Sequence, residues 1–193
     1  MNQQALLKQV EGKPAPGSLL LIQAFANTLD VEDGTDQLES LQSWRRWLQE
    51  AELIAPGARL GSEQLREARE VREAVRALLA ANSAGSSDRG EPDQLSKLLG
   101  DGSVTIAAGD EGALGLDLAP ATDARHFLAQ LRGIVYEAQL KGTWPRLKLC
   151  ENPECDWAFY DSSRNRSGSW CRMGECGNRL KNRAYRARQR RGR

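Results

Sequence analysis

Apolar residues recur at helical spacing in the first half of the chain. From Ser18 to Leu29 they fill nearly every position, which predicts a helix that is buried on most of its sides. A second apolar pattern, from Leu38 to Leu48, predicts an amphipathic helix with Trp44 and Trp47 in the core. The turn residues from 55 to 57 should follow the end of this helix.

Two further helices are expected to pack on these. One should begin after Ser62 as its N-cap and continue to Leu79, with a mixed-charge face from Arg66 to Glu73 that we expect to be solvent-exposed. The other should follow Pro120, with Thr122 or Asp123 as the cap and an apolar stripe that ends at Ala138. The stripe consists of Phe127, Leu128, Leu131, Val135 and Ala138.

Alternating apolar residues at 104–108 and 114–118, with a glycine-containing turn between them, predict a β-hairpin. Residues 31–37 and 82–92 have loop composition, and 94–99 is long enough only for one or two helical turns. Residues 142–145 contain a Gly and a Pro, which disfavour helix. The pattern therefore predicts a mainly α domain with a small β-hairpin (an α+β domain) over residues 1–141 and a separate module over 142–193.

All four cysteines lie in that second module as two pairs, Cys150 with Cys155 and Cys171 with Cys176. Each pair can present two thiolates from one loop, and four thiolates complete the tetrahedron that a structural Zn²⁺ prefers. A closed shell of four sulfurs leaves no position for water or substrate, so this zinc should hold the fold and do no chemistry. The alternatives are two disulfides, a redox role, or four unrelated buried thiols.

The compartment argues against disulfides. Charged residues precede the short apolar run at 19–22, so we expect no signal peptide, and no apolar run approaches the length of a membrane span. We therefore expect a cytoplasmic protein without a membrane partner, where thiols stay reduced.

Charge is divided unevenly along the chain. The formal net charge is +1, but residues 141–193 contain 14 Lys and Arg against 5 Asp and Glu, and the first 140 residues contain 13 against 21. A basic end attached to an acidic body suggests binding of a polyanion.

The basic end has the pattern of a helix. Apolar residues at 173, 176, 180, 184 and 187 form one narrow stripe, arginines lie on its flanks, and Asn182 points away from it. Such a helix could enter the major groove of DNA, with the flanks on phosphates and Asn182 at a base edge. Candidate nucleic-acid contacts are Arg164, Arg166, Arg172, Arg179, Lys181, Asn182, Arg183, Arg186, Arg188 and Arg190. The aromatic residues of 157–160 should form a strand in the small core of the module.

Residues 149–188 also resemble the CGNR-type zinc finger. The signature Cys-Gly-Asn-Arg stands at 176–179, with Cys-x-Asn-Pro-x-Cys at 150–155, Phe-Tyr-Asp at 159–161 and Trp-Cys at 170–171. Upstream, Phe25, Asn27 and Thr28 are similar to the Phe-x-Asn-Thr opening of the ABATE domain that accompanies such fingers, although Ala24 replaces its usual Asp. The resemblance implies a bacterial DNA-binding regulator with a treble-clef-like or ribbon-like finger, and it makes Asn27 a candidate ligand contact. A helix C-cap or a buried hydrogen bond is an equally good interpretation of Asn27.

The function expected from the sequence is DNA binding and transcription regulation. RNA binding and zinc-dependent protein interaction remain as alternatives. His126 is the only histidine, and no catalytic set of Ser, His and Asp or phosphate-binding loop is evident, so no enzyme is expected. The sequence leaves open whether the N-terminal domain binds a small molecule, forms a homodimer or contacts polymerase.

Overall fold

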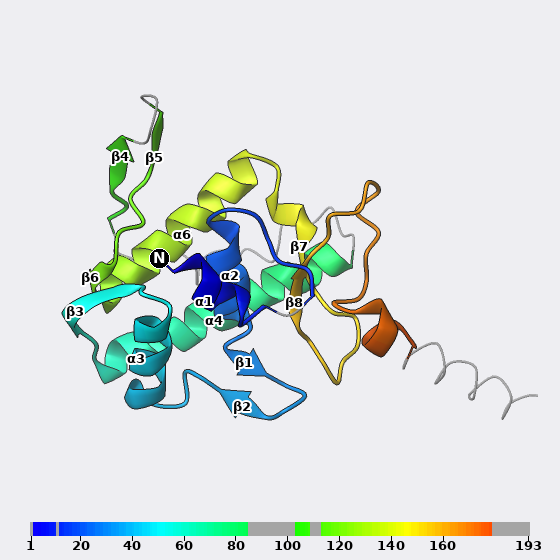
Figure 1. Cartoon of the computed structure of the whole chain (residues 1–193), viewed down its shortest axis with the longest axis horizontal. Coiled ribbons are helices and arrows are strands. Elements are labelled where there is room, and N and C mark those ends of the chain that lie inside the picture. The colour runs from blue at the N-terminus through cyan, green and yellow to red at the C-terminus, as the bar shows by residue number, and fades with distance from the viewer. Residues whose placement is uncertain (1, 11, 85–102, 109–112, 179–193) are drawn as a thin grey trace, which may run out of the picture.

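The structure is a computed structural model that describes residues 2–10, 12–84, 103–108 and 113–178. The helices are α1 (Gln3–Leu7), α2 (Leu19–Ala26), α3 (Leu41–Glu50), α4 (Ser62–Ser83) and α6 (Ala124–Leu140), with a 3₁₀ turn η2 (Trp144–Arg146) and a π turn η3 (Met173–Gly177). The helices α2, α4 and α6 pack against one another near the centre of the molecule, and short strands lie around them (Figure 1). None of the described helices combines the length and apolar character needed to cross a membrane.

Strands within the described residues form four two-stranded sheets. Three sheets are antiparallel: β1 (Leu29–Asp30) with β2 (Thr35–Asp36), β4 (Ile106–Ala108) with β5 (Leu114–Leu116), and β7 (Leu147–Leu149) with β8 (Ala158–Tyr160). The fourth sheet is parallel and joins β3 (Ile54–Arg59) to β6 (Ala121–Asp123). The fold is thus a mixed α/β fold with more strand pairs than the single hairpin that the sequence predicts.

Helix α2 forms the centre of the core. All eight of its residues are buried, which confirms the prediction from its continuous apolar run. The ring of Phe25 meets those of Trp47 and Phe127 at centroid separations of 6.2 and 6.1 Å, in tilted and edge-to-face geometry. Aromatic pairs of this kind add about 0.5–1.5 kcal/mol beyond the area that they bury.

The predicted third helix is present as α4, but two features of it differ from the prediction. The N-cap is Gly61, which makes no side-chain cap bond, and Ser62 is the first helical residue. The mixed-charge face is not wholly exposed, because Arg72 is 3% exposed, and Arg76, which follows that face on α4, is 6% exposed. Arg72 forms an ion pair with Asp36, and Arg76 donates a hydrogen bond to the carbonyl of Ala26. Both guanidinium groups therefore have partners within the fold.

The β4–β5 hairpin and the cap Asp123 of α6 are confirmed, and the carboxylate of Asp123 accepts from the amide of His126 at 2.9 Å. Strands β1, β2, β3, β6 and β7 were not predicted, and β2 lies within the predicted loop at 31–37. Each has few residues, and β3 contains Pro56 and Gly57, so local propensity is weak and pairing with another segment decides their conformation. The predicted helical turns at 94–99 and most of the 82–92 loop lie outside the described residues.

The segment after α6 remains in the core. Trp144 is 6% exposed, and Pro145 fits near the start of the η2 turn, where the missing N–H has no helical partner to lose. Leu147, Leu149 and Ala158 belong to the same buried cluster as the helices. The chain therefore passes from α6 to β7 and β8 by way of a buried tryptophan.

Candidate metal centre and nucleic-acid interface

The β7–β8 hairpin positions the first cysteine pair. Cys150 follows β7 directly and Cys155 lies shortly before β8, and the hairpin pairs Leu149 with Ala158. The amide of Cys150 donates to the carbonyl of Trp157 at 2.9 Å, so the hairpin ladder continues into the metal loop. This ladder holds the two thiols of the loop on the same side.

The second pair comes from a loop and the π turn η3. The amide of Gly177 donates to the carbonyl of Arg172 at 3.3 Å, which is the bond that widens the turn. The start of the predicted basic helix is thus a π turn, and its remainder, from residue 179 on, lies outside the described residues.

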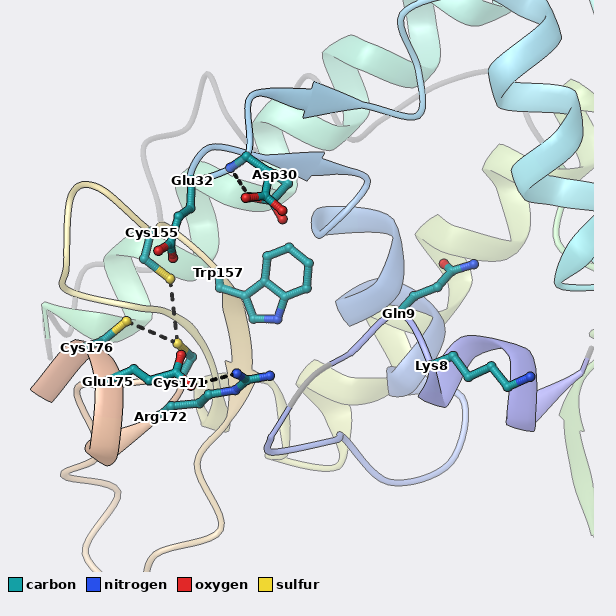
Figure 2. A pocket seen from close by; sticks show the side chains of 11 residues that line it. Lys8, Gln9, Asp30, Glu32, Cys155, Trp157, Cys171, Arg172, Glu175 and Cys176 are labelled. Carbon is teal, nitrogen blue, oxygen red and sulfur yellow. Dashed lines mark hydrogen bonds and ion pairs between the residues drawn. The ribbon is translucent and has the colours of Figure 1, made fainter.

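The four sulfurs converge on one point. All of them lie within 4.8 Å of one another. Figure 2 shows three of them, with 3.6 Å between Cys155 Sγ and Cys171 Sγ and 3.7 Å between Cys171 Sγ and Cys176 Sγ. Four sulfurs at about 2.3 Å from a tetrahedral Zn²⁺ are about 3.8 Å apart, whereas a disulfide needs about 2.05 Å. The cluster therefore fits zinc, and no pair of these cysteines is bonded as a disulfide.

Four thiols at this spacing do not ionise together without a cation. Hydrogen bonds from Cys155 and Cys171 lower the pKa of Cys150 to about 2, and the bond to Cys150 raises the pKa of Cys155. The hydrogen bond with Cys150 also raises the pKa of Cys171 to about 12. Zinc binds thiolates, so its binding must release the protons that these thiols carry without the metal, and it should weaken as pH falls.

Asn152 is the polar side chain that supports the cluster from within the first loop. It is 1% exposed, and its amide nitrogen lies 3.7 Å from Cys176 Sγ as a donor. Its backbone carbonyl accepts from the amides of Cys155 and Asp156 at 2.9 and 3.1 Å. Asn152 therefore both shapes the loop and donates to a metal-binding sulfur.

The segment between α1 and α2 contacts the zinc module through Lys13. The ammonium of Lys13 donates to the carbonyl of Trp170 at 2.6 Å and lies 4.8 Å from the ring centroid of Phe159. Phe159 is fully buried and packs with the four cysteines. Lys13 thus stabilises both the aromatic core of the module and the residue that precedes Cys171.

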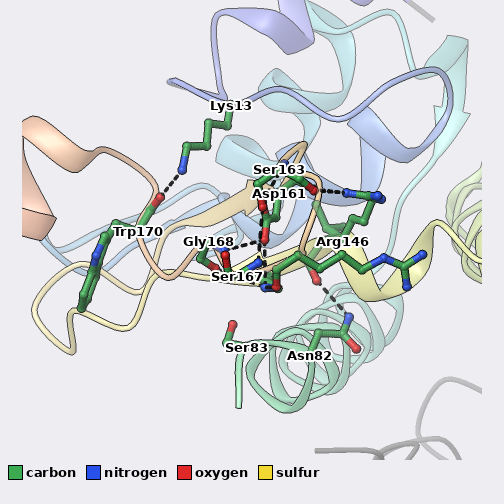
Figure 3. A network of polar contacts seen from close by, with 12 residues as sticks. Lys13, Asn82, Ser83, Arg146, Asp161, Ser163, Ser167, Gly168 and Trp170 are labelled. Carbon is green, nitrogen blue, oxygen red and sulfur yellow. Dashed lines mark hydrogen bonds and ion pairs between the residues drawn. The ribbon is translucent and has the colours of Figure 1, made fainter. Parts of the chain in front are cut away.

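A buried ion pair organises the loop after β8. Asp161 and Lys148 are 2% and 4% exposed, with 3.0 Å between carboxylate and ammonium. Figure 3 shows Asp161 between Ser163 and Gly168, whose amides donate to it at 3.0 and 2.7 Å. A Cβ on Gly168 would come within 2.9 Å of this carboxylate, so only glycine fits there. Although burial raises the pKa of Asp161, its hydrogen bonds from Ser163, Lys148 and Gly168 outweigh burial and lower it.

Helix α2 binds the edge of β8 through two amide side chains. Asn27 accepts from the amide of Ala158 at 2.7 Å and donates to its carbonyl at 3.1 Å, and Gln23 donates to the same carbonyl at 3.1 Å. Asn27 is 7% exposed and is also the C-cap residue of α2. The amide of Asn27 is thus used within the fold. Asn27 also borders a cavity of about 240 Å³ that Trp47 and Trp157 line, and its role as a ligand contact stays a prediction.

Helix α4 binds the other strand of the hairpin. Ser83 accepts from the amide of Leu149 at 3.0 Å and donates to its carbonyl at 2.8 Å, and Asn82 donates to the carbonyls of Trp144 and Leu147. The sequence predicts a loop at Asn82 and Ser83, but both residues belong to α4. Their side chains are polar because they form hydrogen bonds with backbone groups of β7 and of the turn before it.

The predicted nucleic-acid contacts fall into two groups. Arg164 and Arg166 are exposed in the loop that Asp161 organises, and Arg172 is half-buried and forms an ion pair with Glu175 at 3.0 Å. The other predicted contacts lie outside the described residues, namely Arg179, Lys181, Asn182, Arg183, Arg186, Arg188 and Arg190.

Two family models match the chain. The model described as "Putative stress-induced transcription regulator", ABATE, matches residues 20–139, which is more than half of the sequence, and the CGNR zinc finger model matches residues 146–189. Both are regulatory or zinc finger families and neither is an enzyme family. No curated protein matches the sequence. The chain belongs to the ABATE family and carries a CGNR zinc finger whose four cysteines lie close enough together to hold a zinc ion.

Proposed function

We propose that the protein is a cytoplasmic DNA-binding transcription regulator, in which a structural zinc supports a basic C-terminal segment that contacts phosphates. The observation that carries this proposal is the position of the basic residues. The zinc ligand Cys176 is followed within three residues by Arg179, and residues 179–193 contain eight Lys and Arg and no acidic residue. A dense row of cations anchored to a metal site suits a polyanion.

In this proposal the zinc site, the exposed arginines and the N-terminal domain have different roles. Zinc fixes the loops that carry the cysteines, and a shell of four thiolates leaves no open coordination position for chemistry. Arg164 and Arg166 project from the loop organised by Asp161 and would add phosphate contacts beside the basic segment. Asn182 would contact a base edge. The N-terminal domain would sense a small molecule or contact a partner.

The dependence of affinity on salt tests the role of the basic segment. If four to six cations meet phosphates, log affinity for duplex DNA should fall with log salt at a slope of about −4 to −5. Replacing Arg179, Arg183 and Arg186 by Ala should flatten that slope by about 3 units. Arg46→Ala, an exposed arginine on α3, is the control and should leave the slope unchanged. An unchanged slope in the triple variant would exclude this segment as the contact.

The role of the metal is tested separately. Cys171→Ser should lose zinc and DNA binding together, because a cluster with three sulfurs no longer closes the tetrahedron. Ser167→Ala, in the exposed loop before it, is the control. A Cys171→Ser protein that keeps both stoichiometric zinc and binding would refute the four-thiolate assignment.

The identity of the polymer needs a direct comparison. Selection from a random library of DNA duplexes, with and without a chelator, would report sequence preference and metal dependence together. Competition with structured RNA separates DNA binding from RNA binding. RNA binding is the alternative because arginine side chains and the half-buried Trp170 could also contact RNA. Absence of nucleic-acid binding at low salt would instead favour a module that binds an acidic protein partner.

A further inference from the structure

A cavity of about 310 Å³ opens beside the zinc site. Three of the four metal-binding cysteines line it, namely Cys155, Cys171 and Cys176, together with residues of β1 and the β1–β2 turn and with Lys8 and Gln9, which follow α1. Figure 2 shows Asp30 and Glu32 on the far side of the cavity from Glu175, with the sulfurs between them. Three of the cysteines of this site therefore border a space large enough for a small molecule.

The four cysteines are not equally accessible. Cys155 and Cys171 are the more exposed residues of the four, at 6% and 5%, and both line the cavity. Cys176 lines it at 2% exposed, and Cys150, also 2% exposed, does not line it. The sulfurs of Cys155 and Cys171 lie 3.6 Å apart. A reagent entering the cavity thus meets two neighbouring sulfurs that come from different loops.

The charge around the cavity selects which reagents can enter. Four carboxylates line it, those of Asp30, Glu32, Asp33 and Glu175, against two cations, of which Arg172 is paired with Glu175. A zinc ion with four thiolates adds a net charge of about −2. The field therefore repels anions and admits small neutral molecules.

We propose that Cys155 and Cys171 are a modification site, at which a small neutral hydroperoxide oxidises the two zinc-bound sulfurs to a disulfide and releases the metal. A thiolate attacks one peroxide oxygen, the O–O bond breaks, and a sulfenic acid and hydroxide form. The second thiolate attacks the sulfenic sulfur, so the S–S bond forms and a second hydroxide leaves. Two electrons pass from the sulfurs to the peroxide, and two thiolates with one H₂O₂ give one disulfide and two hydroxides.

Loss of the metal follows from this step because only two sulfur ligands remain, Cys150 and Cys176. Two thiolates do not complete the tetrahedron of a structural zinc. The proposal depends on the zinc site and not on what the basic segment binds, so its test needs no nucleic acid. Failure of DNA binding would leave it standing, and failure of oxidation would leave the DNA-binding proposal standing.

The direct test treats the reduced, zinc-loaded full chain with hydrogen peroxide. A chromogenic chelator follows zinc release, and peptide mass spectrometry maps disulfides at the earliest times. We expect about one zinc released per peroxide consumed, with the Cys155–Cys171 disulfide formed first. A first disulfide that contains Cys150 or Cys176, or oxidation of Cys155 and Cys171 with zinc retained, would overturn the proposal.

A second test uses the charge of the reagent. Neutral iodoacetamide should alkylate Cys155 and Cys171 before Cys150, and anionic iodoacetate should react more slowly than its intrinsic reactivity predicts. The double variant with Glu32→Gln and Asp33→Asn should raise the iodoacetate rate roughly two- to four-fold and leave the iodoacetamide rate unchanged, because it removes two charges that line the cavity. Glu39→Gln, exposed but outside the cavity, is the matched control. Equal effects on both reagents would show that the cavity does not select by charge.

Discussion

Two buried polar residues of the zinc module form hydrogen bonds and an ion pair with groups that the fold buries beside them. Asn152 donates to Cys176 Sγ and shapes the first metal loop, and Asp161 neutralises Lys148 while it accepts from two loop amides. The sequence marks both within the resemblance to the CGNR finger, but it does not say which atoms they contact. Their partners make their roles testable residue by residue.

Asn152→Ala should weaken zinc binding by about 10- to 100-fold, because a hydrogen bond to a metal ligand is lost from a buried loop. Competition with a chelator of known affinity measures the change. Asn165→Ala, in the exposed loop, is the matched control and should bind zinc normally. Equal zinc affinity for Asn152→Ala and the native protein would show that the contact with Cys176 has no energetic role.

Asp161→Asn should lower the free energy of unfolding by about 3–5 kcal/mol, since it leaves the ammonium of Lys148 buried without its counter-ion. Because folding lowers the pKa of Asp161, its contribution is complete above the unfolded pKa of about 3.9 and is lost as pH falls through the folded pKa. The difference between the two proteins should thus be constant from pH 5 to 8 and shrink in stronger acid. Urea unfolding at several pH values tests this, with exposed Asp33→Asn as the control.

Strand β8 is the element that both halves of the chain share. At one edge of β8, the backbone of Ala158 forms hydrogen bonds with the side chains of Asn27 and Gln23. The other edge of β8 pairs with β7, and Cys155 lies shortly before the strand. Arg76 of α4 also lies 3.7 Å from Asp156, between Cys155 and the strand. The position of the metal loop is therefore set by helices that are more than 60 residues away in sequence.

Asn27→Ala should reduce stability by about 1–3 kcal/mol, because the amide of Ala158 loses its acceptor and remains buried. The zinc-loaded protein is unfolded in urea to measure this, and Gln37→Ala, an exposed change nearby, should have little effect. If the two variants unfold at the same urea concentration, the bond between α2 and β8 contributes nothing.

At the scale of the whole molecule, the zinc module and the helices share one buried cluster. Trp144, Leu147, Leu149 and Ala158 lie in the same cluster as the aromatic residues of α2, α3 and α6, while the cysteines and Phe159 form a second, smaller cluster beside it. Binding energy of a metal that needs a folded site adds to the stability of whatever folds with that site. Zinc should therefore stabilise the helices as well as its own loops.

Removal of zinc should increase hydrogen exchange in residues 147–177 and also at the ends of α2 and α4 that contact β7 and β8. The β4–β5 hairpin, on the far side of the molecule from β8 (Figure 1), is the internal control and should change least. Exchange is measured by mass spectrometry with and without a strong chelator. Increased exchange confined to 147–177 would show that the two parts fold independently.

The longer helices α2, α3, α4 and α6 were predictable because each depends on a pattern within its own segment, whereas the short helix α1 was not predicted. The apolar run of α2, the tryptophans of α3 and the cap Asp123 of α6 are all local signals. Strands β3 and β6 were not predictable, because they pair in parallel across more than 60 residues and neither has a strong pattern alone. Arg72 looked like a surface residue because the sequence does not reveal that Asp36 lies beside it.

The sequence by itself determined the four sulfur ligands, because their spacing lets two short loops close one tetrahedron, and the charge asymmetry that points to a polyanion. Only the tertiary structure decided what surrounds the sulfurs. The side chains that support them, and the cavity that exposes some of them, come from segments far apart along the chain. Such contacts depend on how the helices pack and not on the order of nearby residues, so no local pattern encodes them.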